Sequence, residues 1–189
     1  YLESLSNYIN LGNNGFEKGD YLGAIANYNQ ALQLNPNLHF NRGLIRYHKS
    51  NDSEGAILHF TEAIRINPNY VDAYVWRGAA RYKIEDKQGA IEDWTEVTKI
   101  IPNYADAYQV RGRARHEIGD EQGAILDYTE TLRMNPNNAE IYFERGVARS
   151  AVEDHQGAIE DYTQVIRINP NSVQAYINRS YHLCVIEDK

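Results

Sequence analysis

The sequence predicts an all-α fold in which antiparallel helix pairs stack as an α-solenoid. The tripeptide Gly-Ala-Ile recurs 32 to 34 residues apart, beginning at Gly23, Gly55, Gly89, Gly123 and Gly157. Arg-Gly recurs in the same phase, beginning at Arg42, Arg77, Arg111 and Arg145, with Arg179-Ser180 as a variant. Asn-Pro-Asn begins at Asn35, Asn67, Asn135 and Asn169, and Ile101-Pro102-Asn103 replaces it once. Three anchors in one phase indicate a repeated structural unit.

Each unit has the pattern of two helices, as the stretch from Val71 to Pro102 illustrates. Apolar residues recur at helical spacing in two stripes, the first at Ala73, Tyr74, Ala80 and Ile84 and the second at Ala90, Ile91, Trp94 and Val97. Pro102 lacks an N–H and ends the second helix. Connections this short make neighbouring helices antiparallel. A single pair cannot bury its apolar face alone, so we expect the pairs to stack.

In chain order, we expect units at about 5–37, 38–70, 71–104, 105–138 and 139–172, and a partial unit at 173–189, all in one array over 1–189. The second unit is irregular, with three residues fewer before Gly43 and one extra residue around Ser50-Asn51-Asp52. Either a turn and helix start have lost three residues, which would shorten that helix, or residues are missing between Asn37 and Leu38.

The two ends of the sequence suggest a piece of a longer protein. The first residue is Tyr1 rather than Met, and the last unit stops after its first helix at Lys189. We expect that more array, or another domain, follows in the native protein.

The period and anchors resemble the tetratricopeptide repeat (TPR), which is two antiparallel helices in 34 residues. The family's aromatic and small residues of the first helix fall at Tyr8 and Gly12, Tyr74 and Gly78, Tyr108 and Gly112, and Tyr142 and Gly146. The resemblance implies a right-handed superhelix of five full units plus a sixth first helix. Arginine replaces the family's large apolar residue before each glycine, which looks like a variant of bacterial TPR arrays.

The arginines recur with acidic residues on the second helices. Arg77, Arg111 and Arg145, and one turn later Arg81, Arg115 and Arg149, accompany Asp93, Asp127 and Asp161. We predict that these arginines pair with these aspartates along the seam of each unit. The functional alternative is an arginine ladder that binds anions.

Composition and motifs argue against several classes of function. The net charge of −7 and the pI of about 5.4 disfavour nucleic-acid binding. No apolar run reaches the length of a membrane span, so we expect no membrane insertion. We expect each of the six histidines to be a lone surface residue, and Cys184 to pack on an apolar helix face. We therefore expect no enzyme activity, no cofactor and no metal, and a single cysteine weakly favours the cytoplasm.

The TPR resemblance implies that the first helices line a concave peptide-binding groove. Projected onto this sequence, the groove-facing residues are Asn10, Asn13, Asn41, Tyr47, Asp72, Trp76, Tyr82, Lys83, Gln109, Arg113, His116, Phe143 and Glu144. Over the whole projected groove, which also includes Glu17, Asp106, Glu117 and Glu140, six acidic residues stand against the two basic residues Lys83 and Arg113. We therefore expect a basic or apolar segment as partner. Some TPR proteins clamp a carboxylate with basic residues, but Ile9, Asp72 and Trp76 stand at those places here, and we expect no such clamp.

These observations favour a non-catalytic scaffold for protein–protein interaction. One alternative is an accessory or regulatory TPR domain of a larger enzyme or signalling protein. Another is a structural array that self-associates through its C-terminal half-unit, where Leu183, Val185 and Ile186 are apolar. For Trp76, the alternative to a binding role is packing on the next unit.

Overall fold

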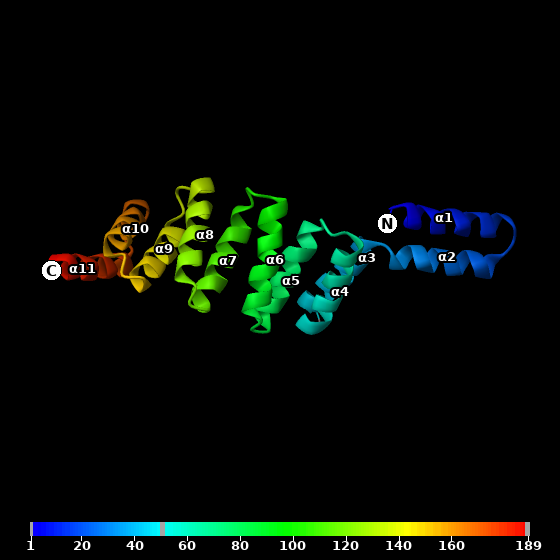
Figure 1. The fold of residues 1–189 in the computed structure, drawn as a ribbon, viewed down its shortest axis with the longest axis horizontal. Coiled ribbons are helices and arrows are strands. Elements are labelled where there is room, and N and C mark those ends of the chain that lie inside the picture. The colour runs from blue at the N-terminus through cyan, green and yellow to red at the C-terminus, as the bar shows by residue number, and fades with distance from the viewer. Residues whose placement is uncertain (1, 50–51, 188–189) are drawn as a thin grey trace. The chain divides into compact units, whose positions relative to one another are not determined.

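The computed structural model describes residues 2–49 and 52–187, which form eleven α-helices and no strand (Figure 1). The first helices of the units are α1 (Leu2–Glu17), α3 (Pro36–Lys49), α5 (Val71–Lys83), α7 (Ala105–Glu117), α9 (Ala139–Ala151) and α11 (Val173–Glu187). The second helices are α2 (Tyr21–Gln33), α4 (Ser53–Ile66), α6 (Lys87–Ile100), α8 (Glu121–Met134) and α10 (His155–Ile168). The predicted all-α solenoid of helix pairs is confirmed.

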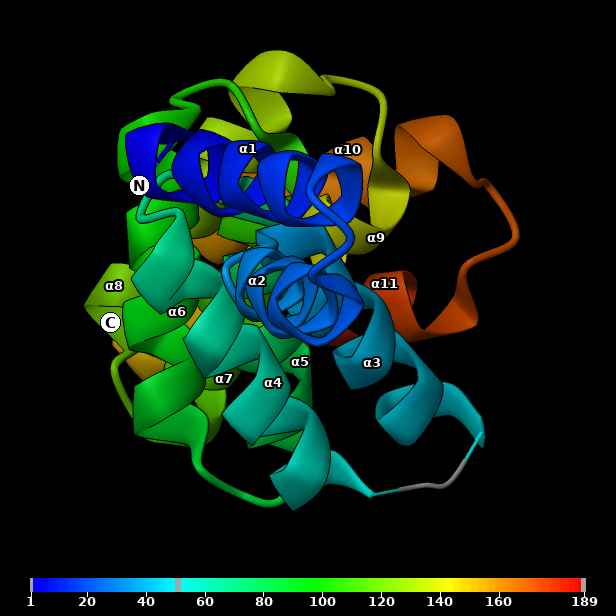
Figure 2. The ribbon, with the colours of Figure 1, turned by 90° about the vertical axis from the view of Figure 1, so that its right-hand side faces the viewer.

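The chain divides into two compact units, Tyr1–Asp86 and Lys87–Lys189. In the first, α1 lies along α2, α3 packs against α4, and α4 packs against α5 (Figures 1 and 2). In the second, each helix from α6 to α11 packs against the next one along the chain. A single array over the whole chain stays a prediction.

The Gly-Ala-Ile anchor marks the capped start of a second helix. In α8, the Asp120 carboxylate accepts a hydrogen bond from the Gly123 N–H at 3.0 Å, which satisfies one of the free amides of the first turn. The same contact recurs at the starts of α2, α4 and α10. A Cβ on Gly123 would overlap the carboxylate of Asp120 and would push this cap aside.

The Asn-Pro-Asn anchor forms the turn between units. The Asn67 side-chain oxygen accepts a hydrogen bond from the Asn69 N–H at 3.2 Å, and Asn169 binds Asn171 at the same distance. This Asx turn holds the backbone while the proline prevents the helix from continuing.

The glycines of three Arg-Gly anchors, Gly43, Gly112 and Gly146, each lie against an aromatic ring. A Cβ on Gly112 would lie 2.8 Å from the Tyr128 ring, and one on Gly146 would lie 2.9 Å from the Tyr162 ring. Tyr128 and Tyr162 are each 1% exposed. The two helices of a unit therefore approach closely because the glycine has no side chain, and the ring fills the space beside it.

The irregular second unit differs from the sequence-based expectation. One of the two alternatives was a shortened first helix, yet α3 has 14 residues and begins at Pro36. Two of the three missing residues come out of the connection, since only Leu34 and Asn35 separate α2 from α3, whereas four residues separate α4 from α5. The third comes from α2, which is one residue shorter than α4. Proline fits the first turn of a helix because its absent N–H would have no partner there. The extra residue expected around Ser50-Asn51-Asp52 falls at 50–51, which lie outside the described residues.

Candidate interaction surface

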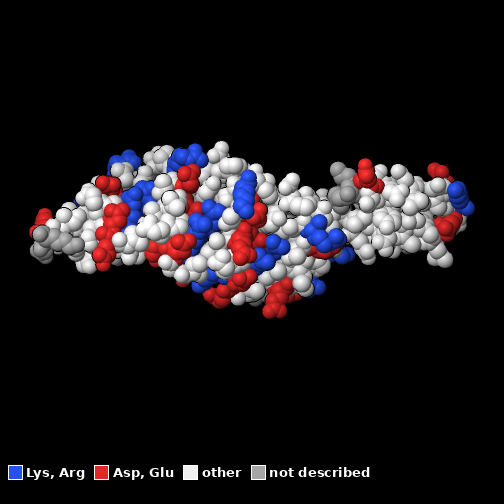
Figure 3. All heavy atoms as spheres, viewed as in Figure 1, with Lys and Arg blue, Asp and Glu red and all other residues white. Residues whose placement is uncertain are grey.

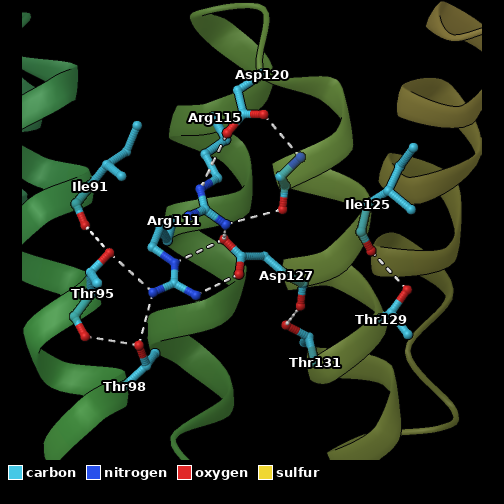
Figure 4. Close-up of polar contacts among 11 residues, drawn as sticks. Ile91, Thr95, Thr98, Arg111, Arg115, Asp120, Ile125, Asp127, Thr129 and Thr131 are labelled. Carbon is cyan, nitrogen blue, oxygen red and sulfur yellow. Dashed lines mark hydrogen bonds and ion pairs between the residues drawn. The ribbon is translucent and has the colours of Figure 1, made fainter.

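The seam between α7 and α8 is an arginine–aspartate network (Figure 4). Arg111 Nε and Nη2 donate to the two carboxylate oxygens of Asp127 at 2.9 and 2.6 Å, and Arg115 Nη1 donates to Asp127 Oδ2 at 2.9 Å. Arg111 Nη1 also donates to the hydroxyls of Thr95 and Thr98, at 3.1 and 2.8 Å. The predicted arginine–aspartate pairing is confirmed in this pair of helices.

The next pair, α9 and α10, repeats the network. Arg145 binds both oxygens of Asp161 at 3.0 and 2.7 Å, and Arg149 Nη1 donates to Asp161 Oδ2 at 3.0 Å. Arg145 Nη1 donates to the Thr129 hydroxyl at 3.0 Å, as Arg111 does to Thr95. Asp127 and Asp161 are buried, and the arginines already have anionic partners. Arg111 is buried, Arg115, Arg145 and Arg149 are half-buried, and all four bind an aspartate, which argues against an anion-binding ladder.

Four of the predicted groove residues belong to the first compact unit's α3 and α5 and carry aromatic or basic groups: Tyr47, Trp76, Tyr82 and Lys83. The Trp76 ring meets Tyr47 edge-on at 5.5 Å and His48 at 4.8 Å, and Lys83 Nζ lies 4.9 Å from the centre of the Tyr47 ring. Trp76 is half-buried. Trp76 thus packs on the preceding first helix, α3, and keeps part of its surface open.

In the second compact unit, α7, α8 and α9 enclose a hollow of about 250 Å³. The residues that line it are Arg113, His116, Glu117, Tyr128, Phe143, Glu144 and Val147. The sequence indicated Tyr128 only as a packing residue. The hollow therefore joins four predicted groove residues, Arg113, His116, Phe143 and Glu144, on two neighbouring first helices.

Charged groups line this hollow in a fixed arrangement. Arg113 donates to Glu144 Oε1 and to Glu140 Oε1, each at 2.6 Å, and His116 Nδ1 lies 2.7 Å from Glu121. Burial raises the pKa of the Glu144 carboxyl, and the hydrogen bond from Arg113 acts in the opposite direction. Glu144 Oε2 is buried and has no hydrogen-bond partner among the described residues. Glu144 thus lines the hollow with one carboxylate oxygen bound to Arg113 and the other covered by the protein.

The remaining predicted groove residues are Asn10, Asn13, Asn41, Asp72 and Gln109. All but Gln109 are exposed, and Gln109 is half-buried on α7. Figure 3 shows acidic and basic side chains interspersed over α6–α10, so neither sign dominates this face. That face is largely uncharged over α2, whose sequence contains no Asp, Glu, Lys or Arg.

The structure corrects two of the sequence-based expectations about single residues. His182 is not a lone surface histidine, because it is 2% exposed and its Nδ1 lies 3.0 Å from Nδ1 of His155. Cys184 was expected to pack on an apolar face, yet it is exposed on α11. No group of three or more metal-ligating side chains occurs among the described residues, and no described helix is long and apolar enough to cross a membrane.

Several solved structures share this fold. A structure of MamA superposes with a TM-score of 0.69 at 26% identity, covering 74% of this chain and 81% of that one. YrrB, described as a TPR protein with an unusual peptide-binding site, has a TM-score of 0.69 at 20% identity and covers 92% and 90% of the two chains. The first TPR of Spaghetti (RPAP3), bound to the HSP90 peptide SRMEEVD, has a TM-score of 0.57 at 20% identity, covering 62% and 93%.

Family comparison agrees with the structural likeness. No curated protein matches the sequence. The family model described as TPR repeat matches residues 12–49 and 46–84, and the one described as tetratricopeptide repeat matches residues 110–173. Together these matches span more than half of the chain and include units on both sides of the boundary between Asp86 and Lys87. The chain belongs to the tetratricopeptide repeat family.

Proposed function

We propose that this protein is a non-catalytic interaction scaffold that binds an extended or helical segment of a partner protein along its first helices. The proposed contact residues are Asn10, Asn13, Asn41, Tyr47, Asp72, Trp76, Tyr82, Lys83, Gln109, Arg113, His116, Phe143 and Glu144. TPR repeats are generally a non-catalytic protein-interaction fold. Of the structural neighbours, YrrB is described as having a peptide-binding site, and the Spaghetti TPR was solved with a bound peptide.

The hollow between α7, α8 and α9 is the observation that carries the proposal. Tyr128, Phe143 and Val147 offer apolar walls for a side chain, and the acidic residues Glu117 and Glu144 line the same hollow. Large aromatic side chains at partly buried positions contribute strongly to interface energies. A segment that inserts an apolar or basic side chain here would gain both kinds of contact.

The charges of the groove favour a basic or apolar segment over an acidic one. Asp72 is exposed in the first turn of α5, and Glu140 is exposed in the first turn of α9. The HSP90 peptide held by the Spaghetti TPR is acidic, and here Asp72 stands at one of the basic places of a carboxylate clamp. An acidic tail would therefore be repelled where a clamp would attract it.

The test is a pull-down from source-cell lysate read by mass spectrometry, with three versions of the chain as bait. The groove variant is Asp72→Lys/Glu140→Lys. The control variant is Glu92→Lys/Glu160→Lys, which makes the same change in net charge at exposed positions on the second helices α6 and α10. We expect a protein that the wild type and the control retain and the groove variant loses. Equal retention by all three baits would contradict a site in the groove.

A second candidate function, self-association, is favoured by the apolar surface of α11. This helix exposes several large apolar side chains, namely Val173, Tyr176, Ile177, Tyr181, Leu183 and Ile186. A surface of this kind is typical of association sites. In this case the mass measured by light scattering should rise with concentration, and Ile177→Glu/Ile186→Glu should abolish the rise. A constant monomer mass in the wild type would contradict self-association.

A further inference from the structure

Two histidines meet inside the contact between α10 and α11. His182 lies on α11 and is 2% exposed, and His155 is the first residue of α10. Their Nδ1 atoms are 3.0 Å apart and their ring centres are 5.2 Å apart. The His182 ring also stacks on Tyr162 of α10 at 6.1 Å, and it meets Tyr181 edge-on at 5.0 Å.

A distance of 3.0 Å between two ring nitrogens is a hydrogen bond, and it needs one Nδ1–H and one free lone pair. A neutral imidazole supplies either, depending on its tautomer, whereas a protonated imidazole can only donate. The contact therefore tolerates one protonated ring at most. When both His155 and His182 are protonated, two N–H groups and two positive charges face each other in a buried place.

The surroundings do not compensate for a second charge. The carboxylate of Asp154 already binds Gly157 N–H and lies 3.5 Å from Arg149, and Asp161 binds Arg145 and Arg149. A hollow of about 440 Å³ lies beside the two rings. It is lined by Ser150 and Ala151 of α9, Glu153 of the following turn, His155 of α10, and Tyr181, His182 and Val185 of α11. Glu153 is the carboxylate of that lining, and it is exposed to solvent.

We propose that His155 and His182 form a pH-sensitive latch that holds α11 against α10. Above neutral pH the pair is hydrogen-bonded and α11 is docked. As pH falls and both rings become protonated, their repulsion releases α11. Release uncovers the apolar cluster that Ala175 of α11 shares with Ala158, Tyr162 and Val165 of α10.

The sign of the effect follows from proton binding. Burial, and next the neighbouring His155, lower the pKa of His182 from its ordinary value of 6.5. A released helix therefore binds more protons than a docked one. The stabilisation is complete above the pKa of the released histidine and is lost as pH falls below it. The opening equilibrium rises by up to about tenfold per pH unit for each extra proton bound.

The test is hydrogen–deuterium exchange of the full chain at pH 7.5 and pH 5.5, corrected for the intrinsic exchange rate. We expect protection of α11 amides to fall by roughly tenfold or more at the lower pH, while amides of α7 keep their protection. His155→Asn keeps a hydrogen-bonding side chain but cannot become charged, so it should remove the part of the pH dependence that comes from repulsion between the rings, while burial of His182 keeps the rest. His116→Asn on α7 is the matched control and should leave α11 unchanged.

Two results would overturn the latch. One is α11 protection that changes with pH no more than that of α7 in the wild type, and the other is a His155→Asn variant with the full pH dependence. If His155→Asn already releases α11 at pH 7.5, imidazole NMR titration of the wild type decides the matter. The latch requires that one ring titrates below pH 6.5, whereas two independent titrations near 6.5 would contradict it.

Discussion

The helix pairs α3–α4 and α7–α8 have the same register but different interiors. In α7–α8, Asp127 stands three residues after Ala124 and binds both Arg111 and Arg115. In α3–α4, the residue three after Ala56 is His59, and Arg46 instead pairs with Asp52 at 2.5 Å near the surface. Burial, and then the positive charge of Arg46, lower the pKa of His59, so the neutral form is favoured there.

The two helix pairs show which parts of the repeat are interchangeable. Both pairs keep a glycine on the first helix against an aromatic ring on the second, Gly43 with Phe60 and Gly112 with Tyr128. The buried carboxylate is present in one pair and absent in the other. The glycine–ring contact therefore sets how closely the helices pack, and the arginine–aspartate network is one of two ways to fill the rest of the seam.

The largest expected effect is that of Asp127→Ala. This change leaves Arg111, which is 7% exposed, and Arg115 without their shared anion, and an uncompensated buried charge costs about 3–5 kcal/mol. Chemical denaturation followed by circular dichroism measures the loss of stability. Asp106→Ala, at an exposed position on α7, is the control and should change stability by no more than about 0.5 kcal/mol. Equal losses for the two variants would show that the network contributes nothing.

A smaller effect is expected for Gly112→Ala. The new Cβ would lie 2.8 Å from the Tyr128 ring, and such overpacking costs about 1–3 kcal/mol. A double-mutant cycle with Tyr128→Leu measures the contact, because removing the ring should remove most of the penalty. A penalty that stays the same in the Tyr128→Leu background would mean that the glycine is needed for some other reason.

The smallest effect is a gain, expected for His59→Asp. This change gives α3–α4 the carboxylate that α7–α8 has, within reach of the charges of Arg42 and Arg46, and a partly exposed ion pair is worth about 0.2–1 kcal/mol. Thermal unfolding measures the shift. His59→Asn has a similar size without the charge, and it should show no gain. A stability decrease in His59→Asp would show that this seam cannot accept the network.

Most of the fold could be predicted from the sequence because each anchor has a local physical cause. Pro36, Pro68, Pro102, Pro136 and Pro170 interrupt the helical pattern, and the aspartates before Gly55, Gly123 and Gly157 cap the helices that follow. The α3 helix was predicted less well because a deletion can be taken from a helix or from its connection. The backbone at Pro36 decides between these, and the sequence pattern does not.

Interactions between units could be predicted less completely. The pairing of Arg111 with Asp127 follows from a repeat that places both residues in one unit. The contact of His155 with His182 joins two units and has no counterpart elsewhere in the repeat pattern, so periodicity gives no signal for it. The groove residues form an intermediate case. The register indicates Arg113, Phe143 and Glu144, but the hollow itself also depends on Tyr128 from a second helix.

The most direct test of the interaction-scaffold account is selection of binding peptides from a random peptide display library. The wild-type chain, the groove variant Asp72→Lys/Glu140→Lys and the control Glu92→Lys/Glu160→Lys would be screened in parallel. The account predicts that the wild type and the control enrich the same basic or apolar peptides, and that the groove variant loses them or selects acidic ones. Acidic peptides selected by the wild type, or one set of peptides for all three chains, would contradict it.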